Sequence, residues 1–216
     1  MQAKTDIQLT SAEIGTLWTT YMNDSMAVCA LKYFLEKEKD TDIRPVIEYA
    51  LGVSQKHIRD ITGFFNKEDY PIPHGFTDDD LDVSSATLYM DVFYLVYLRY
   101  MWTFGLNTYG IALPIMARQD IIDFFLQCLN ESIELNRRVT AIEIAHIYSN
   151  IRNNFGGKAL LTGFAQVAES SKVKELMMRG INIAVKDIEV LSSSLKKDDI
   201  PVPMIGDSFV KALAKV

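Results

Sequence analysis

The feature that most constrains the fold is an internal repeat, found when each residue is aligned with the residue 130 positions later. The match needs no gap over about 65 positions, and apolar positions keep their phase throughout. Thr10 and Glu13 align with Thr140 and Glu143, and "PIP" at 71–73 aligns with "PVP" at 201–203. The chain therefore contains two copies of one supersecondary unit.

Each copy has the pattern of a helical hairpin. Thr10 and Thr140 each precede a glutamate by three residues, which is the signature of a capping box at a helix start. The charged segment 36–42 ends the first helix, and Pro71 ends the second. Apolar residues recur at helical spacing in both helices of the first copy: Ile14, Leu17, Tyr21, Leu31 and Leu35, then Ile43, Ile47, Ala50, Ile61 and Phe64.

Two further helices are expected after the first hairpin, from about 85 to 116 and from about 120 to 138, the second capped by Asp120. Short turns within each pair and one long crossover describe a ferritin-like four-helix bundle. The predicted fold is all-α. The bundle covers residues 9–138, and a half-repeat hairpin over 139–216 repeats residues 9–77 and adds a short tail.

Three segments carry a family resemblance: "LTSAEIGTLWTTYMNDSMAVCALKYFLEKEKD", "YPIPHGFT" and "AIEIAHIYSNIRNNFGGKALLTGFAQVAES". They resemble domain-of-unknown-function family 3231, found mainly in Bacillus and its relatives. The resemblance covers nearly the whole chain and implies tandem ferritin-like bundles, with no known activity. This chain departs from that pattern, because the linker between repeats is nearly absent and the second repeat is truncated before its last two helices. A truncated gene and omitted segments both remain open as explanations.

Composition excludes several classes of function. A net charge of −6 disfavours sequence-independent nucleic-acid binding, which needs clustered cations. Arg99 interrupts the apolar segment 92–117, so we expect a core helix rather than a membrane span. The N-terminus lacks the apolar region of a secretory signal, and Cys29 and Cys128 are expected to be buried thiols. A cytoplasmic location follows as an expectation.

Ferritin-like bundles often hold two metal ions, with a Glu-x-x-His motif on each of two helices, so a metal site is one hypothesis for this chain. Only Glu143 and His146 fit that motif, and one copy cannot complete such a site. Capping at Thr140 explains Glu143 without a metal. No cofactor is therefore predicted, and Glu143 and His146 remain weak metal-ligand candidates.

His57 is the strongest candidate for a binding residue. It lies on the apolar stripe of the second helix, and antiparallel pairing places it level with Asn23. A buried neutral histidine with an Asn or Asp partner is the simpler interpretation, and a ligand contact by His57 and Asn23 is the alternative. Asp187 replaces this histidine in the second copy, so the copies need not share a site.

Two further patterns are interpreted structurally. "NNFGGKAL" resembles a phosphate-binding loop, but it follows no strand and lacks the Ser or Thr that such a loop requires. Its glycines, Gly156 and Gly157, instead suggest a kink or a close approach of helices. A stripe on the third helix is expected to be core rather than a ligand pocket: Tyr89, Phe93, Tyr97, Tyr100 and Phe104.

No arrangement of nucleophile and base has local support, so we predict a non-enzymatic protein with a role in binding or assembly. The alternative is a metal- or small-molecule-binding enzyme that uses the bundle interior. The second hairpin leaves apolar stripes without a cover, which predicts a homodimer through residues 140–200. Packing of that hairpin against the first bundle of the same chain is the competing arrangement.

Overall fold

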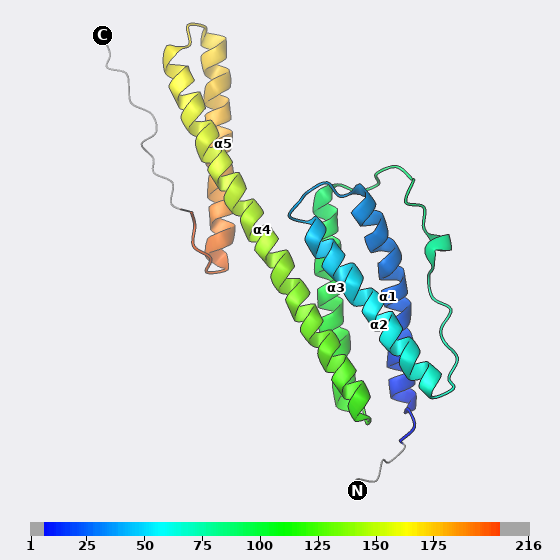
Figure 1. The fold of residues 1–216 in the computed structure, drawn as a ribbon. Coiled ribbons are helices and arrows are strands. Elements are labelled where there is room, and N and C mark those ends of the chain that lie inside the picture. The colour runs from blue at the N-terminus through cyan, green and yellow to red at the C-terminus, as the bar shows by residue number, and fades with distance from the viewer. Residues whose placement is uncertain (1–6, 204–216) are drawn as a thin grey trace. The chain divides into compact units, whose positions relative to one another are not determined.

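The structure is a computed structural model that describes residues 7–203, apart from the side chains of residues 91 and 92. The described residues form only helices and connecting segments, so the predicted all-α class is confirmed. The chain forms two compact units, one up to Thr140 and one from Ala141. The helices, coloured along the chain in Figure 1, are α1 (Ser11–Lys37), α2 (Arg44–Lys67), α3 (Asp91–Ala112), α4 (Gln119–Val167) and α5 (Ser171–Lys197), with short 3₁₀ turns at Asp78–Asp80 and Leu113–Ile115.

The predicted capping box at Thr10 is confirmed and also joins two helices. The Glu13 carboxylate accepts hydrogen bonds from the backbone N–H and hydroxyl of Thr10 at 2.7 and 2.8 Å. Its other oxygen accepts from the backbone N–H groups of Ala117 and Arg118 at 2.9 and 2.8 Å. One buried carboxylate thus satisfies donors at the starts of both α1 and α4.

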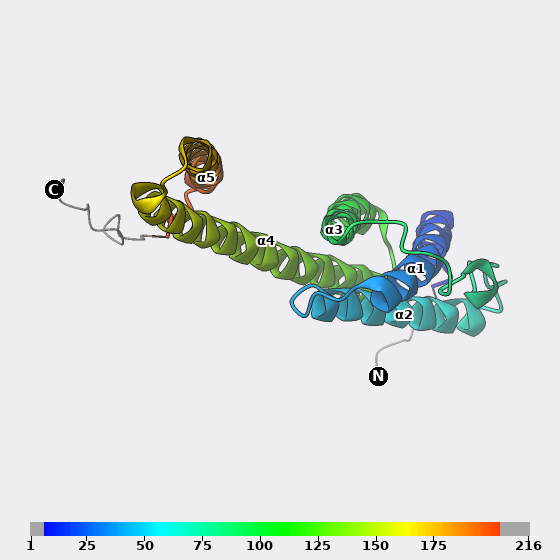
Figure 2. The same cartoon turned by 90° about the horizontal axis from the view of Figure 1, so that it is seen from above.

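A four-helix bundle forms the first unit, and all four helices contribute to one core. In Figures 1 and 2, α1, α2, α3 and the first part of α4 lie side by side. The core contains Leu17 from α1, Ile61 and Phe65 from α2, Tyr109 and Ala112 from α3, and Ile121, Phe124, Phe125 and Cys128 from α4. Burial of these apolar side chains is the main force that holds the bundle together.

The connection between α2 and α3 runs back along α1. The Ser25 hydroxyl accepts a hydrogen bond from the Phe76 backbone N–H at 3.0 Å, and the Tyr33 hydroxyl donates to the carbonyl of Ala86 at 2.7 Å. Gly75 is required there, because a Cβ atom on it would lie 2.5 Å from the Ser25 oxygen. This crossover brings the third helix to the bundle with the long connection that the sequence predicted.

Several predicted boundaries are wrong. The third helix begins at Asp91 rather than near residue 85, and residues 81–90 are not helical. The fourth helix does not end near Arg138, because α4 continues to Val167 and carries the chain into the second copy. Thr140 is therefore inside a helix, where its hydroxyl donates to Asn136 at 3.2 Å. A capping box at Thr140 and Glu143 is excluded, since the backbone N–H groups there are already bonded within the helix.

The second unit is a hairpin made of the rest of α4 and of α5. Few of its described side chains are buried, among them Ile151, Ala184 and Leu195. The Tyr148 hydroxyl donates to the carbonyl of Pro201 and so holds the end of the hairpin. The short tail predicted after Pro203 lies outside the described residues. Among the helices that are described, none has the length and apolar character needed to cross a membrane.

Candidate functional site

A cavity of about 100 Å³ lies inside the first bundle, lined by residues of α1, α2, α3 and α4. Its deep end is formed by buried polar side chains: Thr20, Asp24, Ser54 and His57. The exposed side chains of Met26, Tyr100 and Phe104 line its outer end. The cavity therefore extends from the polar interior of the bundle to an aromatic rim at the surface.

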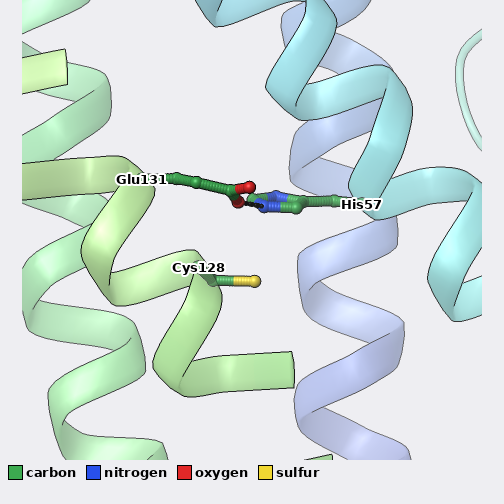
Figure 3. Close-up of side chains that lie close together, drawn as sticks. All are labelled: His57, Cys128 and Glu131. Atoms are coloured by element: carbon green, nitrogen blue, oxygen red, sulfur yellow. Dashed lines mark hydrogen bonds and ion pairs between the residues drawn. The ribbon is translucent and has the colours of Figure 1, made fainter. Parts of the chain in front are cut away.

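His57 on α2 lies between two carboxylates that come from different helices. Its Nδ1 is 3.1 Å from Asp24 Oδ2 on α1, and its Nε2 is 2.7 Å from Glu131 Oε2 on α4. In Figure 3 the Glu131 carboxylate reaches the imidazole from the opposite helix. The three side chains join α1, α2 and α4 at the deep end of the cavity.

The electrostatics of this cluster favour a charged ring. Burial acts to lower the pKa of His57, but hydrogen bonds with Asp24, Cys128 and Glu131 raise it to about 12. Burial acts to raise the pKa of Glu131, and its interactions with His57 and Lys56 bring that pKa below the usual value. His57 is therefore an imidazolium whose two N–H groups both donate to carboxylates. The expectation of a neutral ring is wrong, because it allowed for only one partner.

The cluster continues on α4 through Cys128 and on both sides of Glu131. Glu131 Oε1 accepts hydrogen bonds from Lys56 Nζ at 3.1 Å and Gln127 Nε2 at 2.7 Å. Cys128 precedes Glu131 by three residues, and its thiol, the Glu131 carboxylate and a His57 ring nitrogen lie within 4.8 Å of one another. Burial raises the pKa of the Cys128 thiol, so without a bound cation it is protonated near neutral pH.

Two polar atoms that belong to lining residues have no hydrogen-bond partner among the described residues. They are the hydroxyl of Thr20, a residue only 2% exposed, and the indole nitrogen of Trp102, itself shielded from solvent. A buried polar group without a partner costs about 1–3 kcal/mol. Both groups belong to side chains that line the cavity.

The structure places both predicted binding residues, His57 and Asn23, on the cavity wall. The partner of His57 on α1 is Asp24, however, which is one residue beyond the position that the helical pairing predicted.

The aromatic stripe predicted on the third helix divides into two groups. Tyr89, Phe93 and Tyr97 pack on Phe34, whereas Tyr100 and Phe104 line the cavity. Tyr89, Tyr100 and Phe104 are 42%, 64% and 36% exposed, so the interpretation as core is wrong for these three.

The predicted metal ligands, Glu143 and His146, lie one turn apart on α4 in the second unit, and both are partly buried. No other histidine occurs among the described residues of that unit. A site with a second Glu-x-x-His motif cannot form there from this chain alone. Their role as ligands stays a prediction.

Sequence reasoning missed Asp24, Cys128 and Glu131, although a signal for them existed. Asp24 lies seven residues from Leu17 and from Leu31, which are both fully buried, so it stands at a core position of α1. Glu131 follows Cys128 at helical spacing on the buried face of α4. An acidic residue at a core position needs a buried partner, and His57 was the available one.

Fold and site together define an all-α protein with two copies of a helical repeat, the first of which encloses a polar cavity. The chain belongs to the family described as "Protein of unknown function (DUF3231)", whose model matches residues 1–142 and again residues 134–215. The two matches confirm the internal repeat and the predicted family. No curated protein and no solved structure matches the chain.

Proposed function

We propose that this protein is a non-enzymatic binding protein whose first bundle holds a small molecule in the cavity at His57. The observation that carries the proposal is the pair of unpartnered polar groups, on Thr20 and Trp102, in side chains that line this cavity. Small-molecule sites are mostly apolar cavities with a few convergent polar groups, and this cavity has that composition.

The lining indicates the chemistry of the ligand. Among the lining residues, Asp24 and Glu131 are acidic and His57 is a cation, and Lys56 pairs with Glu131 from outside the lining. Tyr97, Tyr100 and Trp102 provide aromatic surface, which attracts cations as well as apolar groups. The volume is below the roughly 150 Å³ of an engineered cavity that accepts benzene, so the ligand is compact or extends through the rim. A small amine with an apolar body fits these features.

Catalysis is less well supported than binding. Both nitrogens of His57 are occupied by carboxylates, so the ring is poorly placed to accept a proton from a substrate. The Cys128 thiol has a raised pKa, which disfavours the thiolate that a nucleophile needs. The alternative is an enzyme that uses the bundle interior. Its substrate would have to displace Asp24 or Glu131 from His57 before the ring could take part in a reaction.

The test uses three probes with one ring and different head groups: benzylamine, benzyl alcohol and benzoate. In a Trp18→Phe background Trp102 is the sole tryptophan, and its fluorescence reports occupancy of the cavity. We expect saturable quenching or a spectral shift with benzylamine, weaker effects with benzyl alcohol and none with benzoate.

A plugged variant provides the control. Val53→Phe adds volume at a lining residue on α2, whereas Ile58→Phe makes the same kind of change on that helix away from the cavity. Benzylamine binding should be lost in the first variant and kept in the second. Equal binding in both variants, or no saturable signal with any probe, would overturn the proposal.

A second role, assembly as a homodimer through residues 140–200, is supported by the uncovered face of the second hairpin. Leu160, Phe164 and Leu176 are exposed large apolar side chains on this hairpin, with fractions of 63%, 54% and 70%. Apolar surface of that kind usually marks an interface. A second copy of the hairpin presents the same face, and two such hairpins related by a twofold axis make a closed four-helix contact.

Light scattering tests the assembly, with a charge placed at the proposed contact. The full chain should have twice the mass of the 24.5 kDa protomer, and Phe164→Glu should reduce it to the mass of one chain. Val190→Glu is the matched control, because residue 190 aligns with the polar Asp60 of the first copy. A monomeric wild type would remove the assembly role and leave the binding role untouched.

Two broader assignments complete the proposal. The first bundle is assigned to the ferritin-like architecture, supported by two short-linked helix pairs joined by the long crossover between α2 and α3. A cytoplasmic location is supported by Cys29 and Cys128, which are both free thiols, as is usual in a reducing compartment.

A further inference from the structure

We propose that His57, Cys128 and Glu131 form a binding site for one zinc ion at the deep end of the bundle cavity. The site would use the same cavity as the proposed ligand but does not require that ligand to bind. It differs from the paired Glu-x-x-His arrangement considered from the sequence, because its donors come from α2 and from two successive turns of α4.

The donor atoms are already close to the positions that one ion requires. A ring nitrogen of His57, the Cys128 sulfur and a Glu131 carboxylate oxygen lie within 4.8 Å of one another. Donors around a tetrahedral zinc ion with bonds of about 2.0–2.3 Å lie about 3.3–3.8 Å apart. In Figure 3 the Cys128 thiol and the Glu131 carboxylate project from α4 to the same side, on which His57 lies. Side-chain shifts of about 1 Å would complete the geometry.

The atoms that would not bind the ion are already held by neighbours. Asp24 accepts from Nδ1 of His57 at 3.1 Å, which leaves Nε2 as the nitrogen that faces Glu131. Lys56 and Gln127 bind Oε1 of Glu131, which leaves Oε2 toward the ring. A carboxylate behind a ligating histidine is a usual feature of zinc sites, because it fixes the ring and its tautomer. Such contacts make the cluster preorganised for an ion.

The donor set favours zinc over other divalent ions. One thiolate sulfur, one imidazole nitrogen and one carboxylate oxygen suit zinc, whereas magnesium and calcium select oxygen ligands. His57 and Glu131 line the cavity and Cys128 does not, so an ion held by all three would lie at the cavity wall. Three protein ligands with one open position are typical of zinc sites that bind a further molecule.

Cobalt is the spectroscopic probe, because Co²⁺ substitutes for Zn²⁺ and absorbs characteristically when a thiolate binds it. The purified full chain is stripped with a chelator and titrated with Co²⁺ and then with Zn²⁺. We expect one Co²⁺ per chain with a sulfur-to-cobalt absorption band, and displacement of that band by Zn²⁺. Elemental analysis after dialysis against Zn²⁺ should give one zinc per chain.

Matched variants separate this site from adventitious binding. Cys128→Ser should abolish the absorption band, whereas Cys29→Ser should preserve it, because both thiols are buried and only one is in the cluster. Asp24→Asn should weaken affinity about 10–100-fold while keeping the band, as expected for a positioning residue. Circular dichroism verifies that each variant is folded.

Two results would overturn the proposal: no stoichiometric ion in the folded wild type, or a cobalt band that survives Cys128→Ser. Neither result bears on the proposed ligand, because benzylamine binding is measured with metal-free protein. Loss of benzylamine binding with an intact cobalt site would in turn overturn the proposed function alone.

Discussion

The two copies of the repeat differ in what covers their apolar faces. Phe34 in the first copy is 3% exposed, and its equivalent in the second copy, Phe164, is 54% exposed. Phe93 and Tyr97 of α3 pack against Phe34 at ring centroid distances of 6.2 and 5.0 Å. Residues 141–203 contain no helix equivalent to α3. The same hairpin is therefore a bundle component in one copy and an open surface in the other.

The binding site follows the same division. The positions of Thr20, Asp24 and His57 are occupied in the second copy by Asn150, Asn154 and Asp187. The other members of the cluster, Cys128 and Glu131, lie on the part of α4 that has no counterpart in the second copy. A polar cluster needs partners from every side when it is buried. The comparison teaches that α3 and the first part of α4 complete both the core and the site, to which α1 and α2 contribute the remaining residues.

The largest difference in stability between the two copies should appear when the equivalent aromatic ring is removed from each copy in turn. Phe34→Ala should lower the free energy of unfolding by about 3–5 kcal/mol, because it leaves a cavity in a packed core. Phe164→Ala should change it by less than about 1 kcal/mol at low protein concentration, because that ring is half exposed. Urea unfolding followed by circular dichroism measures both, and equal losses would break the comparison.

The second effect concerns the charged cluster. His57→Leu should lower the free energy of unfolding by about 2–4 kcal/mol, because Asp24 and Glu131 lose the cation between them. Asp187→Leu changes the equivalent, exposed position of the second copy and should stay within about 0.5 kcal/mol of wild type. Thermal unfolding of the metal-free proteins compares the two variants. A His57→Leu variant as stable as wild type would show that the cluster contributes little to the free energy of unfolding.

The pH dependence of stability should separate the copies further. The pKa of His57 rises from 6.5 to about 12 on folding, so its contribution is complete below pH 6.5 and is lost as the pH rises toward 12. The difference in unfolding free energy between wild type and His57→Gln should therefore shrink from neutral to alkaline pH. A difference that stays constant would contradict a charged ring.

Glycine substitutions should give the smallest effects, with opposite signs in the two units. A Cβ atom on Gly156 or Gly157 would meet nothing within 4 Å, so the close approach of helices expected there is wrong. Alanine at either position should stabilise α4 by about 1 kcal/mol. Gly105→Ala should destabilise the first bundle, because its Cβ would lie 2.3 Å from the Ser132 hydroxyl oxygen. Differential scanning calorimetry measures these shifts.

Much of the fold could be predicted because the repeat and the helix signals are local. The capping box at Thr10, the proline after α2 and the apolar periodicity each depend on neighbouring residues. The continuation of α4 through Thr140 could not be read in that way. Thr140 and Glu143 match the cap signature, but the residues before them also favour a helix, and the longer helix forms.

The site was predicted only in part, because its members come from distant segments. His57 was identified from its place on an apolar stripe, and its burial in the structure agrees with that place. Its contact with Glu131 joins residues 74 positions apart, which depends on the packing of α2 against α4. Periodicity predicts which face of a helix is buried, but it does not give the axial position of one helix against another.

The most direct test of the central claim is hydrogen–deuterium exchange of equivalent segments at several protein concentrations. The claim is that the chain itself covers the first copy, whereas a second chain covers the second copy. Amides of residues 27–37, in α1, should exchange slowly at every concentration. Amides of the equivalent residues 157–167, in α4, should exchange quickly in dilute protein and become protected as the concentration rises. Protection of residues 157–167 that does not depend on concentration would contradict the account.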